Sequence, residues 1–252
     1  MPRPVFYRPI AHRGLHDRVK GVIENSHAAF EAAIEAGYAI ECDVQLSQDN
    51  VPFIFHDDTL DRLTARNGRP DVLPIAEIVR LELTGSSAHD TPQRFDDFLA
   101  QISGRTLLQI ELKKQPDARR TIALAFAVAA ALKDYRGTYA LESFDPRLIV
   151  ELRRAGSTAP IGIVTHGYDE KSSDRDVGTL GAFALRHLLH WPITRFDFIS
   201  CRDNSLDLTA VRFFRRHGLP ITAWTIRSAD GASAALQHSD QIVFEGFVPL
   251  SA

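Results

Sequence analysis

Short apolar runs alternate along the chain with longer segments in which apolar residues recur at helical spacing. Eight runs predict buried strands, at Pro9–His12, Ala39–Leu46, Thr106–Lys113, Thr138–Glu142, Pro160–Thr165, Phe196–Ser200, Ile221–Ile226 and Gln241–Phe244. Six segments between them predict helices, at Ser26–Ala36, Arg119–Lys133, Pro146–Ala155, Val177–Leu189, Leu208–His217 and Ala229–Gln237. Strands that alternate with helices indicate a parallel α/β sheet, and eight such units predict a (β/α)8 TIM barrel.

One connection is much longer than the others. Val51–Phe55 predicts an extra strand, which pairs with Ala39–Leu46 through the turn Gln48–Asn50. Residues 57–105 then form an insertion and connecting segment, with a polar loop and two predicted helices at Pro74–Leu83 and Pro92–Ile102. No linker rich in Gly, Ser or Pro divides the chain. We therefore expect residues 1–252 to form a single barrel domain with this small insertion after the second strand.

Composition narrows the choice of function. Hydrophobic residues make up 44% and charged residues 24% of the 252 positions, which excludes a disordered or fibrous chain. The formal net charge is −3 and no basic stripe is visible, which argues against a nucleic-acid partner. No apolar run reaches the roughly 20 residues that span a bilayer, so stable membrane insertion is not expected. Two isolated cysteines, Cys42 and Cys201, and an N-terminus without an apolar signal region indicate a cytoplasmic protein, whose oligomeric state stays open.

Two of the predicted strands carry polar residues at alternate positions. Glu41 and Asp43 share one face of their strand, and Glu111 and Lys113 share one face of theirs, in both cases toward the carboxyl end where barrels hold catalytic residues. Three carboxylates in one place repel one another unless positive charge lies between them. Their oxygen atoms favour Mg²⁺ or Ca²⁺ as that charge. An internal salt-bridge network to Lys113 and Arg13 is the alternative, and alternation alone does not separate the two.

Two histidines stand at the ends of predicted strands. His12 ends the first strand and His56 ends the Val51–Phe55 run, each near the carboxylates. A single histidine is more often packed or solvated than catalytic, but a pair in these places could supply a general acid and a general base. His16, His27 and His166 remain undecided. No short-range cluster of His and Cys points to zinc.

These residues belong to motifs that occur in a recognisable order. The motifs are Ala11-His12-Arg13-Gly14, Glu24-Asn25, Glu41-Cys42-Asp43-Val44, His56-Asp57 followed by Leu60–Thr64, Ile110-Glu111-Leu112-Lys113, and, more weakly, Ser143–Pro146 and Ala223–Thr225. In this register they closely resemble the glycerophosphodiester phosphodiesterase family. The resemblance implies a TIM barrel that hydrolyses glycerophosphodiesters to an alcohol and glycerol 3-phosphate.

The resemblance also implies roles for the matching residues. A divalent metal, Mg²⁺ or Ca²⁺, would be held by Glu41, Asp43 and Glu111. The acid–base pair would be His12 and His56, without an assignment of which is the acid. The substrate would contact Arg13 and Lys113 at the phosphate, with Glu24 and Asn25 alongside and Trp224 facing the glycerol. Helix capping is an alternative role for Asn25.

The chain departs from the family pattern at three places. Ser26 stands where many relatives have Thr, and Glu142 stands where an apolar residue is frequent. The segment Phe244-Glu245-Gly246-Phe247 replaces a common Thr-Asp pair and Pro, which leaves the role of the eighth loop open. Glu142 could point into the barrel as an extra carboxylate or outward to solvent.

Two other functions fit parts of the sequence. A lysophospholipase-D-type hydrolase of lipid phosphodiesters would use the same chemistry but needs an apolar channel or membrane-facing surface at the barrel mouth. A catalytically silent barrel that only binds phosphodiesters would be expected to have lost His12, His56 or one of the three carboxylates, and all are present. The hydrolase of glycerophosphodiesters is therefore the favoured function.

Overall fold

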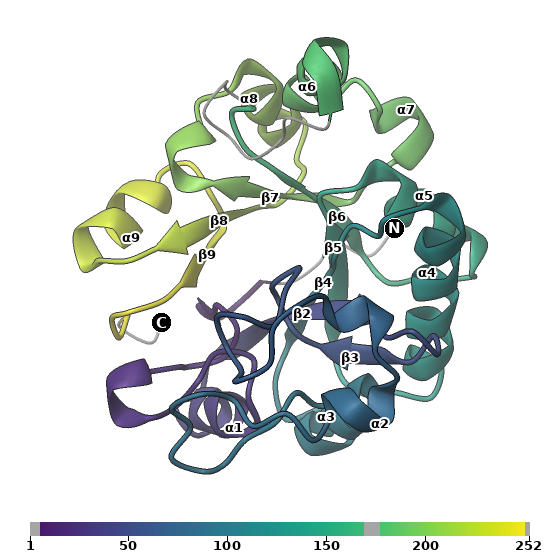
Figure 1. The fold of residues 1–252 in the computed structure, drawn as a ribbon. Coiled ribbons are helices and arrows are strands. Elements are labelled where there is room, and N and C mark those ends of the chain that lie inside the picture. The colour runs from purple at the N-terminus through teal and green to yellow at the C-terminus, as the bar shows by residue number, and fades with distance from the viewer. Residues whose placement is uncertain (1–5, 169–176, 250–252) are drawn as a thin grey trace.

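The computed structural model describes residues 6–168 and 177–249, and in these ranges parallel strands form a closed barrel with helices outside it (Figure 1). Eight parallel strands are β1 Ile10–Ala11, β2 Ala39–Leu46, β4 Leu108–Leu112, β5 Tyr139–Ser143, β6 Ile161–Thr165, β7 Phe198–Arg202, β8 Ile221–Ile226 and β9 Gln241–Phe244. The barrel closes because β1 pairs with both β2 and β9. This architecture confirms the predicted TIM barrel.

The extra strand predicted before the insertion is present. β3, Pro52–Ile54, lies antiparallel to the last residues of β2. The turn between them passes through Asn50, whose φ of +60° lies in the left-handed region that Asn tolerates. The chain therefore doubles back along the end of β2 before the insertion begins.

The helices follow the strands in the predicted order. They are α1 His27–Glu35, α2 Ile75–Ile78, α3 Phe95–Ile102, α4 Ala118–Leu132, α5 Pro146–Arg154, α6 Gly178–Arg186, α7 Trp191–Thr194, α8 Thr209–Arg216 and α9 Ala229–Ala235. Short 3-10 turns occur at Arg18–Lys20, Pro70–Val72 and Asp203–Ser205. Among the described residues no helix has the length and apolar character needed to cross a bilayer.

Several predicted elements differ in their bounds from the observed ones, and for three of them local structure gives the reason. The helix expected at Pro74–Leu83 is the four-residue α2, because Leu83 leaves the helix to bridge Thr64 and pack among buried apolar side chains. The helix expected at Val177–Leu189 ends at Arg186, after which Leu188 turns through a φ of +53° and α7 begins. β7 starts two residues later than predicted, since Phe196 packs into the helix layer against Phe214 at a ring distance of 5.2 Å.

The alternation predicted for β2 separates two environments. Ile40, Cys42 and Val44 are fully buried in the layer between the strands and the outer helices. Glu41 and Asp43 point the other way, into the barrel, and are nearly as completely buried. Burial of the apolar face fixes the register of the strand, because a slip by one residue would exchange the two faces. The interior carboxylates are therefore held in place by the outer core.

A glycine fixes the loop that follows β1. Gly14 has a φ of +80°, and a Cβ at this position would lie 2.8 Å from the carbonyl carbon of Ala29 in α1. Only glycine meets both conditions, since the left-handed conformation is unfavourable for other residues and the space is already filled. The loop carrying His12 and Arg13 is thus pressed against the start of α1.

We expect Gly14→Ala to destabilise the protein by more than the roughly 1–2 kcal/mol that a left-handed backbone costs an alanine. The matched control is Gly37→Ala, because Gly37 has a similar φ of +78° but no atom within 4 Å of a Cβ. Urea unfolding of the two variants measures the difference. Equal losses of stability would mean that contact with α1 contributes nothing.

Candidate active site

The carboxyl ends of the strands converge on a pocket at one mouth of the barrel. The lining residues are His12, Arg13, Glu41, His56, Gln109, Glu111, Lys113, Glu142, Phe144, Val164, Ser200, Trp224 and Val243. Seven of the ten residues singled out in the sequence are in this lining, and Asp43, Glu24 and Asn25 lie directly behind it. Residues far apart in the chain therefore meet at the face where TIM barrels carry out their chemistry.

Carboxylates from neighbouring strands form a row inside the barrel. In the pairing of β2 with β4, Asp43 lies opposite Glu111, and in the pairing of β4 with β5, Glu111 lies opposite Glu142. Glu41 lies two residues before Asp43 on the same face. One oxygen each from Glu41, Asp43 and Glu111 lie within 4.8 Å of one another, and all three residues are buried.

Two basic side chains form ion pairs with these carboxylates and neutralise part of their negative charge. The Lys113 Nζ lies 2.8 Å from Glu111 and 3.4 Å from Asp43, and the Arg13 Nε lies 3.3 Å from Asp43. Burial acts to raise the pKa of Asp43, but Lys113 and Arg13 outweigh burial and hold the pKa well below its ordinary value. The salt-bridge network considered from the sequence is therefore present.

In this network one carboxyl group has too little positive charge nearby to stabilise its ionised form. Burial, with the nearby charges of Asp43 and Glu111, raises the pKa of Glu41 well above its ordinary value. A hard divalent cation among these oxygens would neutralise the excess and let Glu41 ionise. The donor set of three buried carboxylates thus fits Mg²⁺ or Ca²⁺.

The loop after β1 is built around Arg13 and Asn25. Both have positive φ values, +57° and +54°, a conformation uncommon for residues with side chains and frequent at functional sites. The Arg13 N–H donates to Glu41 at 2.9 Å, and the Asn25 side chain donates to Asp43 at 2.8 Å. Ser26, not Asn25, caps α1 by accepting from the Ala29 N–H. The two strained residues therefore orient two of the candidate metal ligands.

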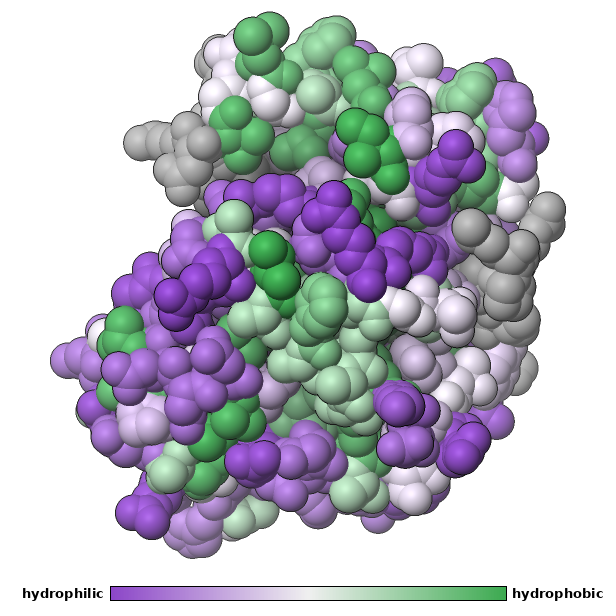
Figure 2. Space-filling model, turned by 90° about the vertical axis from the view of Figure 1, so that its right-hand side faces the viewer, coloured by the Kyte–Doolittle hydropathy of each residue, from purple (hydrophilic) through white to green (hydrophobic). Residues whose placement is uncertain are grey.

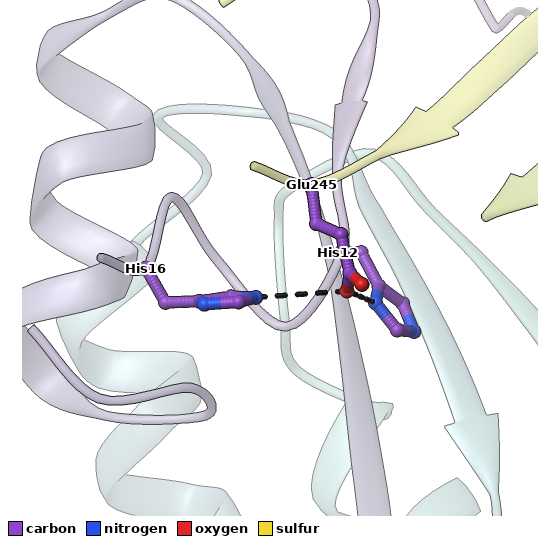
Figure 3. Close-up of side chains that lie close together, drawn as sticks. All are labelled: His12, His16 and Glu245. Atoms are coloured by element: carbon purple, nitrogen blue, oxygen red, sulfur yellow. Dashed lines mark hydrogen bonds and ion pairs between the residues drawn. The ribbon is translucent and has the colours of Figure 1, made fainter. Parts of the chain in front are cut away.

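A carboxylate that sequence reasoning left unassigned lies against His12. The Oε2 of Glu245, just after β9, is 2.6 Å from the Nδ1 of His12 and 3.8 Å from the Nε2 of His16, so that it lies between the two rings (Figure 3). The Nε2 of His12 lies 3.9 Å from Glu41, on the side of the pocket. Burial lowers the pKa of His12, against the opposing effect of its hydrogen bond to the Glu245 carboxylate.

The second histidine has the same arrangement. The Nδ1 of His56 lies 2.7 Å from Oδ1 of Asp57, and two hydrogen bonds from the Gln45 amide to the carbonyls of Phe55 and Asp57, at 3.0 and 2.7 Å, hold the loop. Asp57 keeps a pKa below its ordinary value because the hydrogen bonds from His56 and Arg62 outweigh its burial. An ionised carboxylate only accepts hydrogen bonds, so the Nδ1 of His56 carries the proton and Nε2 is left for other partners.

Arg62 joins the loops that carry the candidate residues. Its guanidinium donates to Asp57 at 2.6 and 2.8 Å and to Glu24 at 2.6 and 2.8 Å. Glu24 also accepts from Arg13 at 2.6 Å, and the two arginines lower the pKa of Glu24 to about 2 despite its burial. Glu24 is thereby fully engaged by cations, in a supporting position behind Arg13.

Two aromatic residues also line the pocket. Trp224 packs edge-on against Phe144 at a ring distance of 5.6 Å, and its indole N–H donates to the carbonyl of Ser200 at 3.1 Å. Because this hydrogen bond fixes the ring, Trp224 presents a rigid apolar surface to the pocket.

Glu142 points into the barrel, which answers the question that the sequence left open. Its carboxyl group accepts from Gln109 at 2.9 Å, and burial raises its pKa to about 8. Between the ordinary value of 4.5 and about 8, the folded protein holds a proton that the unfolded chain has lost. Stability therefore falls as the pH rises through this interval.

We expect Glu142→Gln to remove this loss and to be more stable than the wild type by roughly 3 kcal/mol at pH 7, with no advantage near pH 4.5. Urea unfolding at several pH values in the presence of a chelator provides the measurement. Glu35→Gln, at an exposed position of α1, is the control. Wild type and Glu142→Gln curves that run parallel with pH would show that Glu142 is ionised in the folded protein.

Sequence reasoning missed the carboxylates behind the histidines and the arginine that ties the loops. Asp57 and Arg62 lie in the motifs quoted above, yet nothing in their spacing says that they meet. Glu245 was part of a departure from the family pattern, and its position directly after the last strand was the available signal.

Comparisons with known proteins show which family the chain resembles. Residues 12–243 match the model of the Glycerophosphoryl diester phosphodiesterase family. The Bacillus subtilis protein YhdW is 24% identical and covers 89% of this chain and 88% of its own length; glycerophosphodiester phosphodiesterase 1 of Bos taurus is 25% identical and covers 91% and 74%. A phosphodiesterase from Oleispira antarctica, solved with its product sn-glycerol-3-phosphate, has 22% identity, a TM-score of 0.76 and coverage of 97% and 93%.

The fold and the family match define the class of protein: a TIM-barrel hydrolase of phosphoric diesters. More particularly, the chain belongs to the glycerophosphodiester phosphodiesterase family, as its motifs indicated.

Proposed function

We propose that the protein hydrolyses glycerophosphodiesters to an alcohol and glycerol 3-phosphate, in a reaction that depends on a divalent cation. The observation that carries the proposal is the pocket itself, in which Glu41 and Glu111, two basic side chains and two histidines face one cavity, with Asp43 directly behind its lining. The product bound by the Oleispira antarctica enzyme of the same fold supports this choice of substrate.

Arg13 and Lys113 are proposed to bind the phosphate. A phosphodiester monoanion repels nucleophiles, and two preorganised cations would neutralise it and stabilise the further charge of the transition state. Glu41, Asp43 and Glu111 would hold the divalent cation, which when bound supplies positive charge and makes nearby hydroxyl groups more acidic. Arg13 is held toward the pocket by Glu24, whose other partner, Arg62, anchors the loop.

His12 and His56 are proposed to exchange protons with the reacting oxygens through their Nε2 atoms. One histidine takes the proton of the glycerol 2-hydroxyl as that oxygen attacks phosphorus, and the other protonates the alcohol oxygen as its bond to phosphorus breaks. Water then opens the cyclic phosphate, with the histidines in exchanged roles. In the alternative route water attacks phosphorus directly, and the same pair serves as base and acid.

Trp224 and Phe144 would pack against the glycerol carbons. Their rings line the same pocket as the charged groups, so it offers contacts to both a charged phosphate and a small carbon backbone.

Lipid phosphodiesters are a second candidate substrate class, because of one surface feature. Large apolar side chains are exposed along α6, α7 and the segment between them, at Leu180, Phe183, Leu189 and Ile193, and Figure 2 shows hydrophobic side chains in this upper part of the molecule. Residues 177–196 contain two arginines and no acidic residue. Such a surface suits an anionic lipid interface.

A panel of substrates tests the proposal. Purified protein with Mg²⁺ or Ca²⁺ is incubated with glycerophosphocholine, glycerophosphoethanolamine or lysophosphatidylcholine, and glycerol 3-phosphate and choline are assayed. We expect glycerol 3-phosphate from the first two. Faster cleavage of lysophosphatidylcholine would assign the lipid function, and binding without turnover of any of them would contradict the proposal in favour of a silent barrel.

A further inference from the structure

We infer that Glu245 is a positioning residue, which holds the ring of His12 in one tautomer and directs its Nε2 toward the reacting atoms. The inference rests on the proposed role of His12 in proton transfer. It concerns the segment in which the chain departs from its relatives, Phe244–Phe247, for which the resemblance offered no role.

The first step of the argument is the charge of Glu245. Its pKa is held well below the ordinary value, chiefly by the hydrogen bond from His12, together with His16 and the charge of Arg227. The Nε and Nη2 of Arg227 lie 2.8 and 2.6 Å from Oε1, the oxygen that faces away from His12. Glu245 is therefore an acceptor on both oxygens, with one committed to each neighbour.

The second step is the tautomer of His12. Since Oε2 of Glu245 only accepts, the Nδ1 at 2.6 Å must donate, and the neutral ring then carries its lone pair on Nε2. That nitrogen lies on the pocket side, 3.9 Å from Glu41. Figure 3 shows the Glu245 carboxylate beside a nitrogen of the His12 ring, and this contact to Nδ1 also restrains rotation of the ring.

The third step is the comparison with His56. Asp57 binds the Nδ1 of His56 at 2.7 Å as Glu245 binds that of His12, so both candidate histidines are oriented from behind by a carboxylate. One carboxylate adjoins its histidine in sequence, whereas the other directly follows the last strand of the barrel. A carboxylate in this position fixes ring and tautomer and stabilises the imidazolium that forms during proton transfer.

A metal site is the competing explanation, because one atom each from His12, His16 and Glu245 lie within 4.8 Å of one another. The geometry favours positioning. Arg227 already supplies a positive charge to Glu245, and the contact of 2.6 Å with Nδ1 is that of a direct hydrogen bond.

The test compares Glu245→Ala and Glu245→Gln with the wild type. We expect Glu245→Ala to lower kcat by roughly 10- to 100-fold, by analogy with the loss seen when carboxylates that orient metal-bound histidines are removed, with KM nearly unchanged. Glu245→Gln has one acceptor oxygen for two donors; with that oxygen on the Arg227 guanidinium, its amide NH2 faces Nδ1 and favours the other tautomer, so kcat should fall in this variant as well. Glu82→Ala is the matched control, because Glu82 binds the Nδ1 of the exposed His89 at the same kind of distance, 2.7 Å.

Two further readouts separate positioning from a structural role. Nitrogen NMR of the His12 ring should show the proton on Nδ1 in the wild type and a mixture of tautomers in Glu245→Ala. In a His12→Ala background, Glu245→Ala should lower the residual kcat no further, because it acts through the ring that is already gone. The number of bound divalent ions should be the same in all variants.

Each contrary result has one meaning. Wild-type kcat in Glu245→Ala, beside a large loss in His12→Ala, would overturn the inference and leave the proposed function standing. Loss of a bound ion in Glu245→Ala would overturn it in favour of a metal site, and additive losses in the double variant would reduce Glu245 to a structural residue. Near-native kcat in His12→Ala would contradict the proposed function itself.

Discussion

Replacement of His12 or His56 by alanine is expected to lower kcat by about 10²-fold or more, the usual scale for loss of general acid–base catalysis. Both histidines line the pocket, and each has its Nδ1 bound by a carboxylate. The double variant should be little slower than either single variant, because the two histidines act together in the same step, one removing a proton and the other supplying one. Rates of glycerol 3-phosphate release under saturating substrate measure the effect.

His89→Ala is the control for these variants, since its side chain is 80% exposed and outside the pocket. It should retain the wild-type kcat. A folded His12→Ala or His56→Ala variant with near-native kcat would return that histidine to a structural role, and losses that multiply in the double variant would mean that the two act in separate steps.

Lys113→Ala should raise the barrier of the reaction by roughly 2–4 kcal/mol while the metal stays bound, as expected for one preorganised contact to developing negative charge. Lys113 and Glu111 are two residues apart on one strand end and touch at 2.8 Å, yet we assign them different partners, the phosphate and the cation. Glu111→Gln should therefore weaken metal affinity and activity together, whereas Lys113→Ala should lower only activity.

Stability distinguishes this assignment from a purely structural salt bridge. Without metal, Lys113→Ala leaves Asp43 and Glu111 short of positive charge and should unfold more easily than the wild type. With saturating Mg²⁺ or Ca²⁺ we expect the difference nearly to vanish, and Lys114→Ala, at an exposed neighbouring position, should behave as wild type throughout. Strong destabilisation with the metal lost, even at saturating concentration, would defeat the assignment of Lys113 to the phosphate.

Most of the fold can be predicted from the sequence, because the pattern of apolar and polar residues that sets each strand and helix is local. The alternation in Ala39–Leu46 and the helical spacing after each strand show which face of each element is buried. Burial of these faces against one another determines the barrel architecture. The ends of strands and helices are harder to predict where tertiary packing overrides the local pattern of apolar residues. Phe196 lies in a pattern that predicts a strand but packs against helix α8. Leu83 lies in a pattern that predicts a helix but packs in a cluster of buried apolar side chains that includes Phe53 and Ile78.

Some contacts of the candidate site could likewise be predicted from local spacing, and others could not. Glu41, Asp43, Glu111 and Lys113 could be placed on one face from spacing of two residues, since a strand fixes side-chain direction. The contact between Glu245 and His12 joins residues 233 positions apart, and no periodicity reports it. The bridge from Arg62 to Glu24 is likewise set by the path of the loops, which tertiary packing decides.

Metal counting together with product release tests the central claim most directly, namely that the pocket hydrolyses its substrate only with a divalent cation held by Glu41, Asp43 and Glu111. The protein is stripped with a chelator, the bound metal is measured, and glycerol 3-phosphate release from glycerophosphocholine is followed before and after Mg²⁺ or Ca²⁺ is restored. We predict no activity in the stripped protein and recovery as about one cation binds per chain, with neither in Glu111→Gln. Full activity in excess chelator from protein that contains no metal would contradict the account.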